Sequence, residues 1–268
     1  MTLMGGTSEI ALRRAIVDAG RKLYQRGLIA ASDGNISALL EGPDRHGGAG
    51  RVLVTPSAVW KGEMTPDMLL VVDFTGKRLK GDRAATSELP MHLAVYRCRP
   101  DVRAVVHAHP PLATAYAVAH THLGEPLLSE VVLRLGAIER VAYNAPSTEQ
   151  LATSVAASVA DHDVLLLANH GALTVGHDLP DALGRMETLE HFATISLAVR
   201  QLGGGIRLSD SQVAELRALA SAGRFAADQP QPWSPPGQPC TTCDVWRQAV
   251  TAKVASEVVK QLAKANIP

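Results

Sequence analysis

The segment "AVVHAHPP", residues 104–111, restricts the possible folds more than any other part of the sequence. Its apolar residues suit a buried strand, yet it carries His107 and His109 and is ended by two prolines. Burying an imidazole costs free energy unless the ring is hydrogen-bonded. Side chains two positions apart on a strand share one face, so both rings face one point, as ligands of a divalent metal ion do. Two hydrogen-bonded histidines on a polar sheet face are the alternative.

A third imidazole and a carboxylate strengthen the metal hypothesis. His170 lies in "LLLANHGALTVG", directly after an apolar strand. A lone His-Gly pair more often marks a turn, but with the earlier pair it completes a three-histidine site with an open coordination position. Glu88 begins the helix of "TSELPMHL", where the helix dipole alone would explain a carboxylate; the functional alternative is metal ligation or proton transfer. His92 shares its helical face and is the less favoured ligand, because the other histidines lie at strand ends.

The remaining histidines and the cysteines are given no catalytic role. Those histidines lie in predicted loops or solvated helix positions: His46, His120, His122, His162, His177 and His191. Three cysteines (Cys98, Cys240 and Cys243) are too few for a secreted disulfide framework. Cys240 and Cys243 form one C-x-x-C, which lacks the second pair of a four-ligand structural zinc site. A pair shared between subunits, a disulfide and two plain thiols all remain open.

Helical and strand patterns alternate along the chain and predict one α/β domain. Helices are expected over 9–27, 86–100, 147–162 (with a serine cap) and 178–204, and strands over 31–40, 51–57, 69–79, 102–109 and 163–176. From about residue 228 the chain becomes rich in proline. We therefore expect a catalytic domain over 1–225, followed by a proline-rich linker and a C-terminal helical arm over 226–268.

The charge balance limits the partners of this protein. Twenty-six basic residues balance 26 acidic ones, so no overall field attracts nucleic acid or an anionic membrane. No segment reaches the ~18 consecutive apolar residues of a membrane helix. The first residues lack the order of a signal peptide. We expect a cytoplasmic protein that binds a small molecule, with neither nucleic acid nor a membrane as partner.

Four segments, in this order, resemble a known family: "SDGNISALL", "VLVTPSAVWKGEMTPDMLLVVD", "TSELPMHLAVYRCRPDVRAVVHAHPPLATAYAV" and "LLLANHGALTVGHDLPDALGRMETLEH". The sequence resembles the class II aldolase/adducin family, particularly proteins like L-fuculose-1-phosphate aldolase. The resemblance implies a three-layer α/β/α fold with a central, mainly antiparallel sheet flanked by helices. It also implies a homotetramer with active sites at subunit interfaces.

The resemblance assigns roles to individual residues. It implies that His107, His109 and His170 bind one divalent metal ion per subunit, zinc or, as in some members, manganese, and that Glu88 is the catalytic acid/base. The phosphate-binding residues that it implies are Gly34, Asn35, Ser57, Thr86 and Ser87. A helix N-terminus after Thr86 and Ser87 would favour an anion, although both fit equally well as plain caps. Ala58 stands where the aldolases have glycine, which alters that part of the pocket.

The reaction implied is cleavage of a ketose 1-phosphate to dihydroxyacetone phosphate and an aldehyde through a metal-stabilised enediolate. The sequence departs from the aldolase pattern at two positions, both in the part of the site that binds the aldehyde. Glu130 in "PLLSEVVL" takes the position of a family tyrosine, and no tyrosine follows Tyr143, whereas the aldolases use one in the C-terminal tail. An aldehyde unlike lactaldehyde is therefore expected.

Three other activities occur in the family. Decarboxylases would explain the missing tyrosines, although those acting on aromatic acids carry histidine at the position of Asn35. The 4-epimerases carry aspartate at the position of Glu88, which disfavours them. Adducin heads are non-enzymatic scaffolds that keep the fold without the metal site, and the intact three-histidine set argues against that class.

Overall fold

The computed structural model describes residues 8–41, 50–119 and 121–221 of the 268-residue chain. The expected domain boundary near residue 225, the linker and arm over 226–268, and four residues named above (His46, His120, Cys240 and Cys243) lie outside the described residues. The fold is therefore discussed for the predicted catalytic domain alone.

A single mixed sheet forms the centre of the molecule. Its strands are β1 (Asn35–Glu41), β2 (Arg51–Val54), β3 (Leu70–Asp73), β4 (Arg78–Lys80), β5 (Ala104–Ala108), β6 (Ile138–Val141), β7 (Val164–Leu167) and β8 (Gly171–Gly176). They lie side by side in the order β4-β3-β2-β1-β5-β8-β7-β6. Within the described residues, β6 and β7 pair in parallel and every other neighbouring pair is antiparallel. The mainly antiparallel sheet is thus confirmed, with β5 in its interior.

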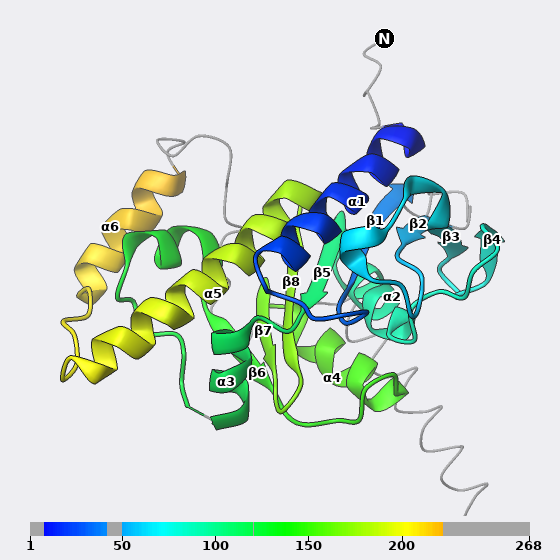
Figure 1. Ribbon diagram of the computed structural model, residues 1–268. Helices are drawn as coiled ribbons and strands as arrows, with labels where there is room; N and C mark the ends of the chain where they lie inside the picture. Colours follow the sequence, from blue (N-terminus) through cyan, green and yellow to red (C-terminus); the bar gives the residue numbers. More distant parts are fainter. Residues whose placement is uncertain (1–7, 42–49, 120, 222–268) are drawn as a thin grey trace, which may run out of the picture.

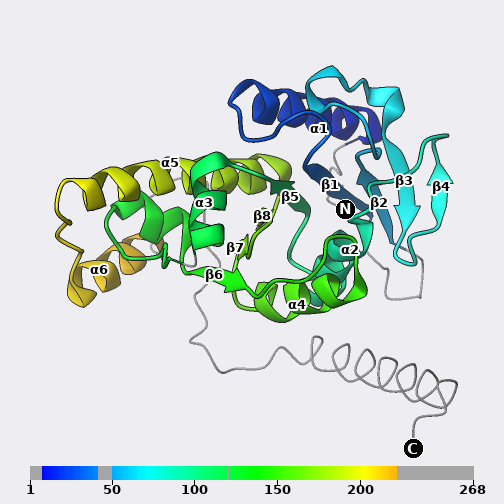
Figure 2. The ribbon, with the colours of Figure 1, turned by 60° about the horizontal axis from the view of Figure 1, so that its bottom comes forward.

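Helices cover both faces of this sheet (Figures 1 and 2). They are α1 (Glu9–Gln25), α2 (Leu89–Cys98), α3 (Pro111–Ala119), α4 (Glu149–Val159), α5 (Leu179–Gln201) and α6 (Asp210–Ser221), with short turns η1 (Lys61–Glu63), η2 (Pro66–Met68) and the π-helical η3 (Val131–Leu135). Helices α1, α3 and α5 pack on one face, and α2 and α4 on the other. Among the described residues, no helix has the length and apolarity that a membrane crossing requires.

The two apolar layers follow from strand alternation. In β5, Ala104, Val106 and Ala108 belong to the core beneath α1, α3 and α5, whereas Val105 belongs to the core beneath α2 and α4. Successive side chains of a strand point to opposite faces, so a strand covered on both sides reads as an unbroken apolar run. The predicted three-layer α/β/α fold is therefore confirmed.

Local signals placed most helix ends correctly, with two errors. The expected hydroxyl cap of α2 is wrong, because Glu88 is its N-cap and no side chain caps the helix. Helix α1 begins after Ser8, whose Oγ accepts a hydrogen bond from the backbone N–H of Ala11 at 3.2 Å. The expected serine cap of α4 is wrong: Thr148 is the cap, and its Oγ1 accepts from the N–H of Leu151 at 3.3 Å. Ser147 instead has a positive φ of 64° in the preceding turn. Segments α3, η3, β6 and α6 are not anticipated from the sequence.

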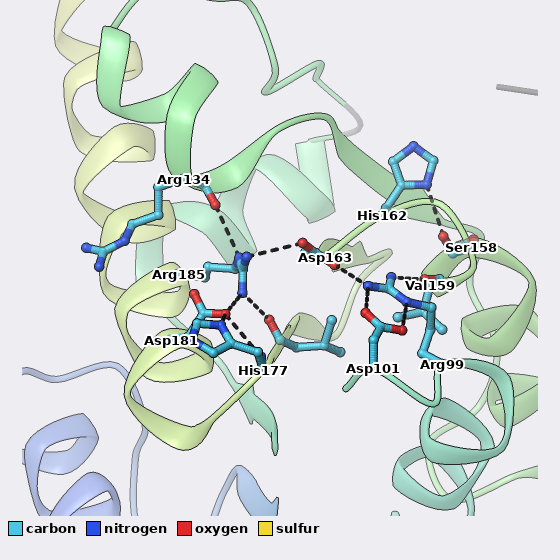
Figure 3. Close-up of polar contacts among 11 residues, drawn as sticks. Arg99, Asp101, Arg134, Ser158, Val159, His162, Asp163, His177, Asp181 and Arg185 are labelled. Atoms are coloured by element: carbon cyan, nitrogen blue, oxygen red, sulfur yellow. Dashed lines mark hydrogen bonds and ion pairs between the residues drawn. The ribbon is translucent and has the colours of Figure 1, made fainter. Parts of the chain in front are cut away.

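A partly buried ionic network joins one end of the sheet to α5 (Figure 3). Arg99 Nη2 lies 2.7 Å from Asp101 Oδ2 and 3.0 Å from Asp163 Oδ1. Arg185 Nη2 lies 3.2 Å from Asp163 Oδ2, and Nη1 of Arg185 pairs with Asp181. These residues precede β5, precede β7 and follow β8. The network therefore fixes the same end of three neighbouring strands.

Candidate active site

Three histidines meet at the opposite end of those strands. His107 lies near the end of β5, His109 directly follows it, and His170 lies in the turn between β7 and β8. The ring centroids are 5.0 Å apart for His107 and His109, 4.8 Å for His107 and His170, and 5.1 Å for His109 and His170. One nitrogen from each ring lies within 4.8 Å of the others. This spacing suits three nitrogens that each bind one metal ion at about 2.0–2.1 Å.

The backbone explains how these rings are aimed. Strands β5 and β8 are paired so that His107 lies opposite Leu173 and Ala108 opposite Ala172. His107 Nδ1 lies 2.9 Å from the Ala172 carbonyl oxygen. Because that oxygen only accepts, Nδ1 carries the proton and Nε2 presents its lone pair to the cluster. His109 Nε2 lies 3.2 Å from His107 Nε2, so both rings offer the same nitrogen.

Burial keeps His109 and His170 in the neutral form that binds metal. It lowers the pKa of His170 to about 4, with the proximity of His107 adding to the effect. The pKa of His109 is lowered for the same two reasons. On the far side of the His109 ring, Nδ1 lies 3.5 Å from Asp33 Oδ2. At neutral pH these rings are neutral ligands.

Glu88 faces the histidines with both carboxylate oxygens. It is the N-cap residue of α2. Its Oε2 lies 3.1 Å from His107 Nε2, and its Oε1 lies 3.4 Å from His170 Nε2. Asn35 Nδ2 donates to Oε2 at 2.9 Å. Burial raises the pKa of Glu88, but His107, Asn35 and His170 together outweigh it and hold the pKa well below its usual range. The group is therefore a carboxylate.

Polar atoms left without partners indicate what this cluster lacks. Glu88 Oε1 and His170 Nδ1 are buried and have no hydrogen-bond partner among the described residues. A buried carboxylate oxygen with no donor is costly. Here Glu88 Oε1 lies 3.4 Å from His170 Nε2, so a cation held among the imidazole nitrogens would satisfy that oxygen. The residues present fit a divalent metal ion.

The expected phosphate-binding residues come from three adjoining segments. Gly34 and Asn35 lie at the start of β1, Ser57 after β2, and Thr86 and Ser87 before α2. Asn35 and Thr86 are buried, whereas Ser57 and Ser87 are exposed and open to a ligand. The structure brings these segments together.

Thr55, which sequence reasoning missed, links the three segments. Its Oγ1 accepts from the N–H of Ile36 at 3.2 Å, and its carbonyl accepts from the N–H of Thr86 at 3.2 Å. The N–H of Ser57 donates to the Ala84 carbonyl at 2.9 Å. Thr55 is fully buried in the middle of these contacts. No local pattern marks it, because its partners are distant in sequence.

Two unusual backbone conformations shape this region. Gly34 has a φ of +67°, and a Cβ there would lie 2.8 Å from the carbonyl oxygen of His107. The glycine therefore permits β1 to approach the metal-site strand. Ala58 has a φ of 55°, in the left-handed region that glycine tolerates and other residues occupy at a cost of about 1–2 kcal/mol. At this position alanine retains a conformation suited to the family's glycine.

Lys61 ties together the two loops that contain Ser32 and Val59. Its side chain is buried, and Nζ donates to the carbonyl oxygens of Ser32 and Val59, both at 2.8 Å. Burial lowers the pKa of Lys61 to about 8, with the Asp33 carboxylate opposing the effect. Sequence reasoning missed this residue as well, because a lysine in a loop is normally expected to be exposed to solvent.

His92 does not join the histidine cluster. Its Nε2 lies 2.5 Å from Asn35 Oδ1, and the ring is fully buried. Ser37 and Tyr96 lie beyond it and also escaped sequence reasoning. Spacing offered a signal for each: Ser37 is two residues from Asn35 on a strand, and His92 and Tyr96 follow Glu88 at four-residue intervals on a helix.

Comparisons with known proteins show the family to which this chain belongs. The family model described as Class II Aldolase and Adducin N-terminal domain matches residues 14–197. This chain belongs to the class II aldolase and adducin family. The 3-oxo-tetronate 4-phosphate decarboxylase of Escherichia coli K12 is 34% identical over 218 residues, which cover 78% of this chain and 96% of the relative. The L-fuculose phosphate aldolase of Methanococcus vannielii is 36% identical over 174 residues, which cover 65% and 89%.

Solved structures of this family share the fold. The crystal structure of YgbL from Escherichia coli has a TM-score of 0.70 and 33% sequence identity, covering 78% of this chain and 99% of that one. The family predicted from the sequence motifs is confirmed. Its aldolases and decarboxylases are lyases, and class II aldolases depend on a divalent metal, which the three histidines of this chain could bind.

Proposed function

We propose that the protein is a divalent-metal-dependent lyase that breaks a carbon–carbon bond beside the ketone of a small phosphorylated substrate. The observation that carries this proposal is the contact of Glu88 with His107 and His170, one carboxylate oxygen to each ring. An ionised acid/base group thus adjoins the metal-binding nitrogens. His107, His109 and His170 would hold zinc or manganese, which supplies Lewis-acid stabilisation of negative charge on substrate oxygens.

The two kinds of relative suggest one common substrate half. Loss of CO₂ from 3-oxo-tetronate 4-phosphate leaves dihydroxyacetone phosphate. Cleavage of L-fuculose 1-phosphate between C3 and C4 leaves dihydroxyacetone phosphate and an aldehyde. In both reactions the carbon that loses its neighbour carries a hydroxyl and adjoins the ketone. A site that recognises this three-carbon phosphate serves either reaction.

Residues of this chain act on that common half. The phosphate lies against the N-terminus of α2, bound by Gly34, Asn35, Ser57, Thr86 and Ser87. Glu88 carries a proton to and from the hydroxyl-bearing carbon. The fixed positions of Asn35 and Glu88 reduce the reorganisation that this transfer requires.

Loss of CO₂ is the reaction we favour. Aldol cleavage must remove a proton from the hydroxyl that becomes the aldehyde, and the resembling aldolases place tyrosines on that side. This chain has Glu130 at one such position and no tyrosine after Tyr143. Within the described residues, Glu130 makes no hydrogen bond or ion pair with the histidines or Glu88. Release of CO₂ needs no proton transfer at the departing fragment.

Aldol cleavage of a ketose 1-phosphate is the second candidate. The similarity to the aldolase of Methanococcus vannielii favours it. The sequence alone also favours it, since Asn35 argues against decarboxylases of aromatic acids. Asn35 does not argue against decarboxylases of phosphorylated substrates, and the relative in Escherichia coli is one of these.

The reaction can be identified with metal-loaded protein and two substrates. We expect 3-oxo-tetronate 4-phosphate to yield CO₂ and dihydroxyacetone phosphate, and L-fuculose 1-phosphate to react slowly. The reverse preference would establish the aldolase. In D₂O, dihydroxyacetone phosphate should exchange a hydrogen at its hydroxyl-bearing carbon under either alternative. Protein that exchanges no hydrogen and consumes neither substrate would refute both, and protein that takes up no divalent ion would indicate a scaffold.

We also propose that the protein forms a homotetramer with active sites at subunit boundaries. The family resemblance supports this assembly. Light scattering during size-exclusion chromatography measures the mass directly, and a monomer would contradict it.

A further inference from the structure

A continuous chain of buried side-chain hydrogen bonds leads away from the active site. It runs from Glu88 to Asn35 (2.9 Å), from Asn35 to His92 (2.5 Å), from His92 to Ser37 (2.7 Å) and from Ser37 to Tyr96 (2.8 Å). Asn35, Ser37, His92 and Tyr96 are each no more than 4% exposed. Each of the four hydrogen bonds joins a residue of β1 to a residue of α2 or to its N-cap Glu88, so together they tie the strand to the helix start that carries Glu88.

The Glu88 carboxylate at one end fixes the direction of every hydrogen bond in this series. Glu88 is a carboxylate and only accepts, so the Asn35 amide presents its nitrogen to Glu88 and its oxygen to His92. That oxygen also only accepts, so His92 Nε2 carries the proton. Nδ1 of the same neutral ring must then accept from the Ser37 hydroxyl. Ser37 in turn accepts from the hydroxyl of Tyr96.

The properties of His92 suit a fixed donor. Burial lowers the pKa of His92 to about 3, so the ring is neutral at every pH at which the protein would work. A neutral imidazole has one donor and one acceptor nitrogen, and here both are used. His92 Nδ1 is occupied by Ser37, which prevents the proton from moving to that nitrogen.

We propose that His92 is a positioning residue: it holds the Asn35 amide in the orientation that aims Glu88 at the reacting carbon. This inference rests on the proposed function of Glu88. With Oε2 held by Asn35, Oε1 is the oxygen left to move the proton. Asn35 Nδ2 has two hydrogens, and one remains to bind the phosphate. One amide thereby couples the bound phosphate to the acid/base group.

A purely structural role for His92 makes a different prediction. In that case its loss would lower stability, while folded, metal-loaded protein would keep its full rate. Under our proposal the rate itself falls, because Asn35 can turn its amide and present its oxygen to Glu88. The two possibilities separate when the exchange rate is measured per metal-loaded chain.

Three variants of the full chain test this role, with hydrogen exchange of dihydroxyacetone phosphate in D₂O as the readout. His92→Phe keeps the ring volume and removes both hydrogen bonds. His92→Gln retains an N–H in reach of the Asn35 oxygen. Thr174→Val is the matched control, because Thr174 Oγ1 in β8 donates a buried hydrogen bond of 2.7 Å to the Ala182 carbonyl in α5, outside this series of hydrogen bonds.

We expect His92→Phe to reduce the maximal exchange rate about 10- to 100-fold, as loss of an outer-shell partner commonly does. His92→Gln should recover most of the rate, and Thr174→Val should lose stability without losing rate. All three should bind one metal ion per chain. A wild-type rate in His92→Phe, or an equally slow His92→Gln, would overturn the proposal. Should His92→Phe fail to fold, Ser37→Ala tests the same path, with a smaller loss expected.

A second measurement does not depend on activity. Neutron diffraction of the wild-type protein locates the hydrogens of His92 and Asn35 directly. We expect hydrogen on His92 Nε2 and the Asn35 NH₂ group facing Glu88. Hydrogen on Nδ1, or a reversed amide, would refute the positioning role even if the enzyme is active. If wild-type protein shows no exchange but these hydrogens are found as expected, the proposed function fails and the hydrogen-bond chain stands.

Discussion

Gly171 lies so close to His109 that a Cβ on residue 171 would be 2.5 Å from His109 Cδ2 and 2.6 Å from the Ala108 carbonyl oxygen. Only a residue without a side chain permits β8 to begin beside the metal-site histidines. The glycine after His170, which reads as part of a turn, is thus also a requirement of the site.

Gly171→Ala should therefore displace the His109 ring and weaken metal binding about 10- to 100-fold. Competition with a chromogenic chelator measures this affinity. Gly184→Ala is the control, because the nearest atoms to its new Cβ belong to the flexible end of Arg134, at 3.3 Å. Equal affinities in the two variants would contradict the packing argument.

Glu88→Gln tests the acid/base assignment. The amide keeps the shape of the carboxylate but cannot take up the proton, so exchange into dihydroxyacetone phosphate should fall about 10²- to 10⁴-fold. Metal content should stay at one ion per chain, because the three imidazoles are intact. Isotope exchange followed by NMR gives the rate. A loss of less than tenfold would exclude Glu88 as the group that moves the proton.

Stability should depend on pH through His92. Burial lowers its pKa from 6.5 to about 3. Below pH 6.5, His92 is protonated in the unfolded chain but stays neutral in the folded chain, so lowering the pH favours unfolding. The stability linked to His92 is therefore fully present above pH 6.5 and is lost as the pH falls toward 3. The free energy of unfolding should drop by up to about 1.4 kcal/mol per pH unit from this group. Urea unfolding at several pH values measures this free energy. Its slope against pH should be shallower for His92→Gln than for the wild-type protein, and identical slopes would disprove the role of His92 in this pH dependence.

Lys61→Met should weaken substrate binding more than turnover. The variant keeps the length of the side chain but loses two hydrogen bonds that tie the loops of Ser32 and Val59. At about 0.5–1.5 kcal/mol per bond, the KM for dihydroxyacetone phosphate in the exchange assay should rise several-fold, with kcat little changed. Lys80→Met, which removes an exposed ion pair with Glu9, should alter neither value. A fall in kcat at constant KM would contradict this role for Lys61.

Arg185→Met should destabilise the fold without impairing the site. It leaves Asp181, only 3% exposed, without its buried partner, which commonly costs about 3–5 kcal/mol. Arg21→Met removes the exposed pair with Asp18 and should cost less than about 1 kcal/mol. Thermal unfolding compares the two. Folded Arg185→Met should keep its exchange rate, because the network in Figure 3 lies at the opposite ends of β5, β7 and β8.

The sequence predicted those parts of the site that depend on local periodicity. Strand alternation was enough to pair His107 with His109, and the capping pattern was enough to place Glu88 at a helix start. The partnership of Asn35 and His92 could not be predicted, because it depends on how β1 pairs with β5 and how α2 packs on the sheet. Residues 57 residues apart carry no joint local signal.

Helix α3 shows the same limit for the fold. In "HPPLATAYAV" the two prolines correctly end β5, yet Pro111 is also the first residue of α3. Proline is tolerated at that position, since its missing N–H would have no partner there. The residues that follow are apolar on all sides, so no helical stripe distinguishes them from loop or strand.

Strand β1 lies beside β5, with Asn35 opposite His107, and β5 lies beside β8. The candidate metal ligands, Glu88 and Asn35 thus lie on or directly beside three adjacent strands and one helix start, and Ser57 follows the next strand, β2. Glu130, at the position where the resembling aldolases have a tyrosine, lies outside that unit, before η3. Under the proposed function, the choice of departing fragment is therefore separable from the strands that hold the reacting carbon, so substitutions near Glu130 should alter which substrate is cleaved while metal affinity stays the same.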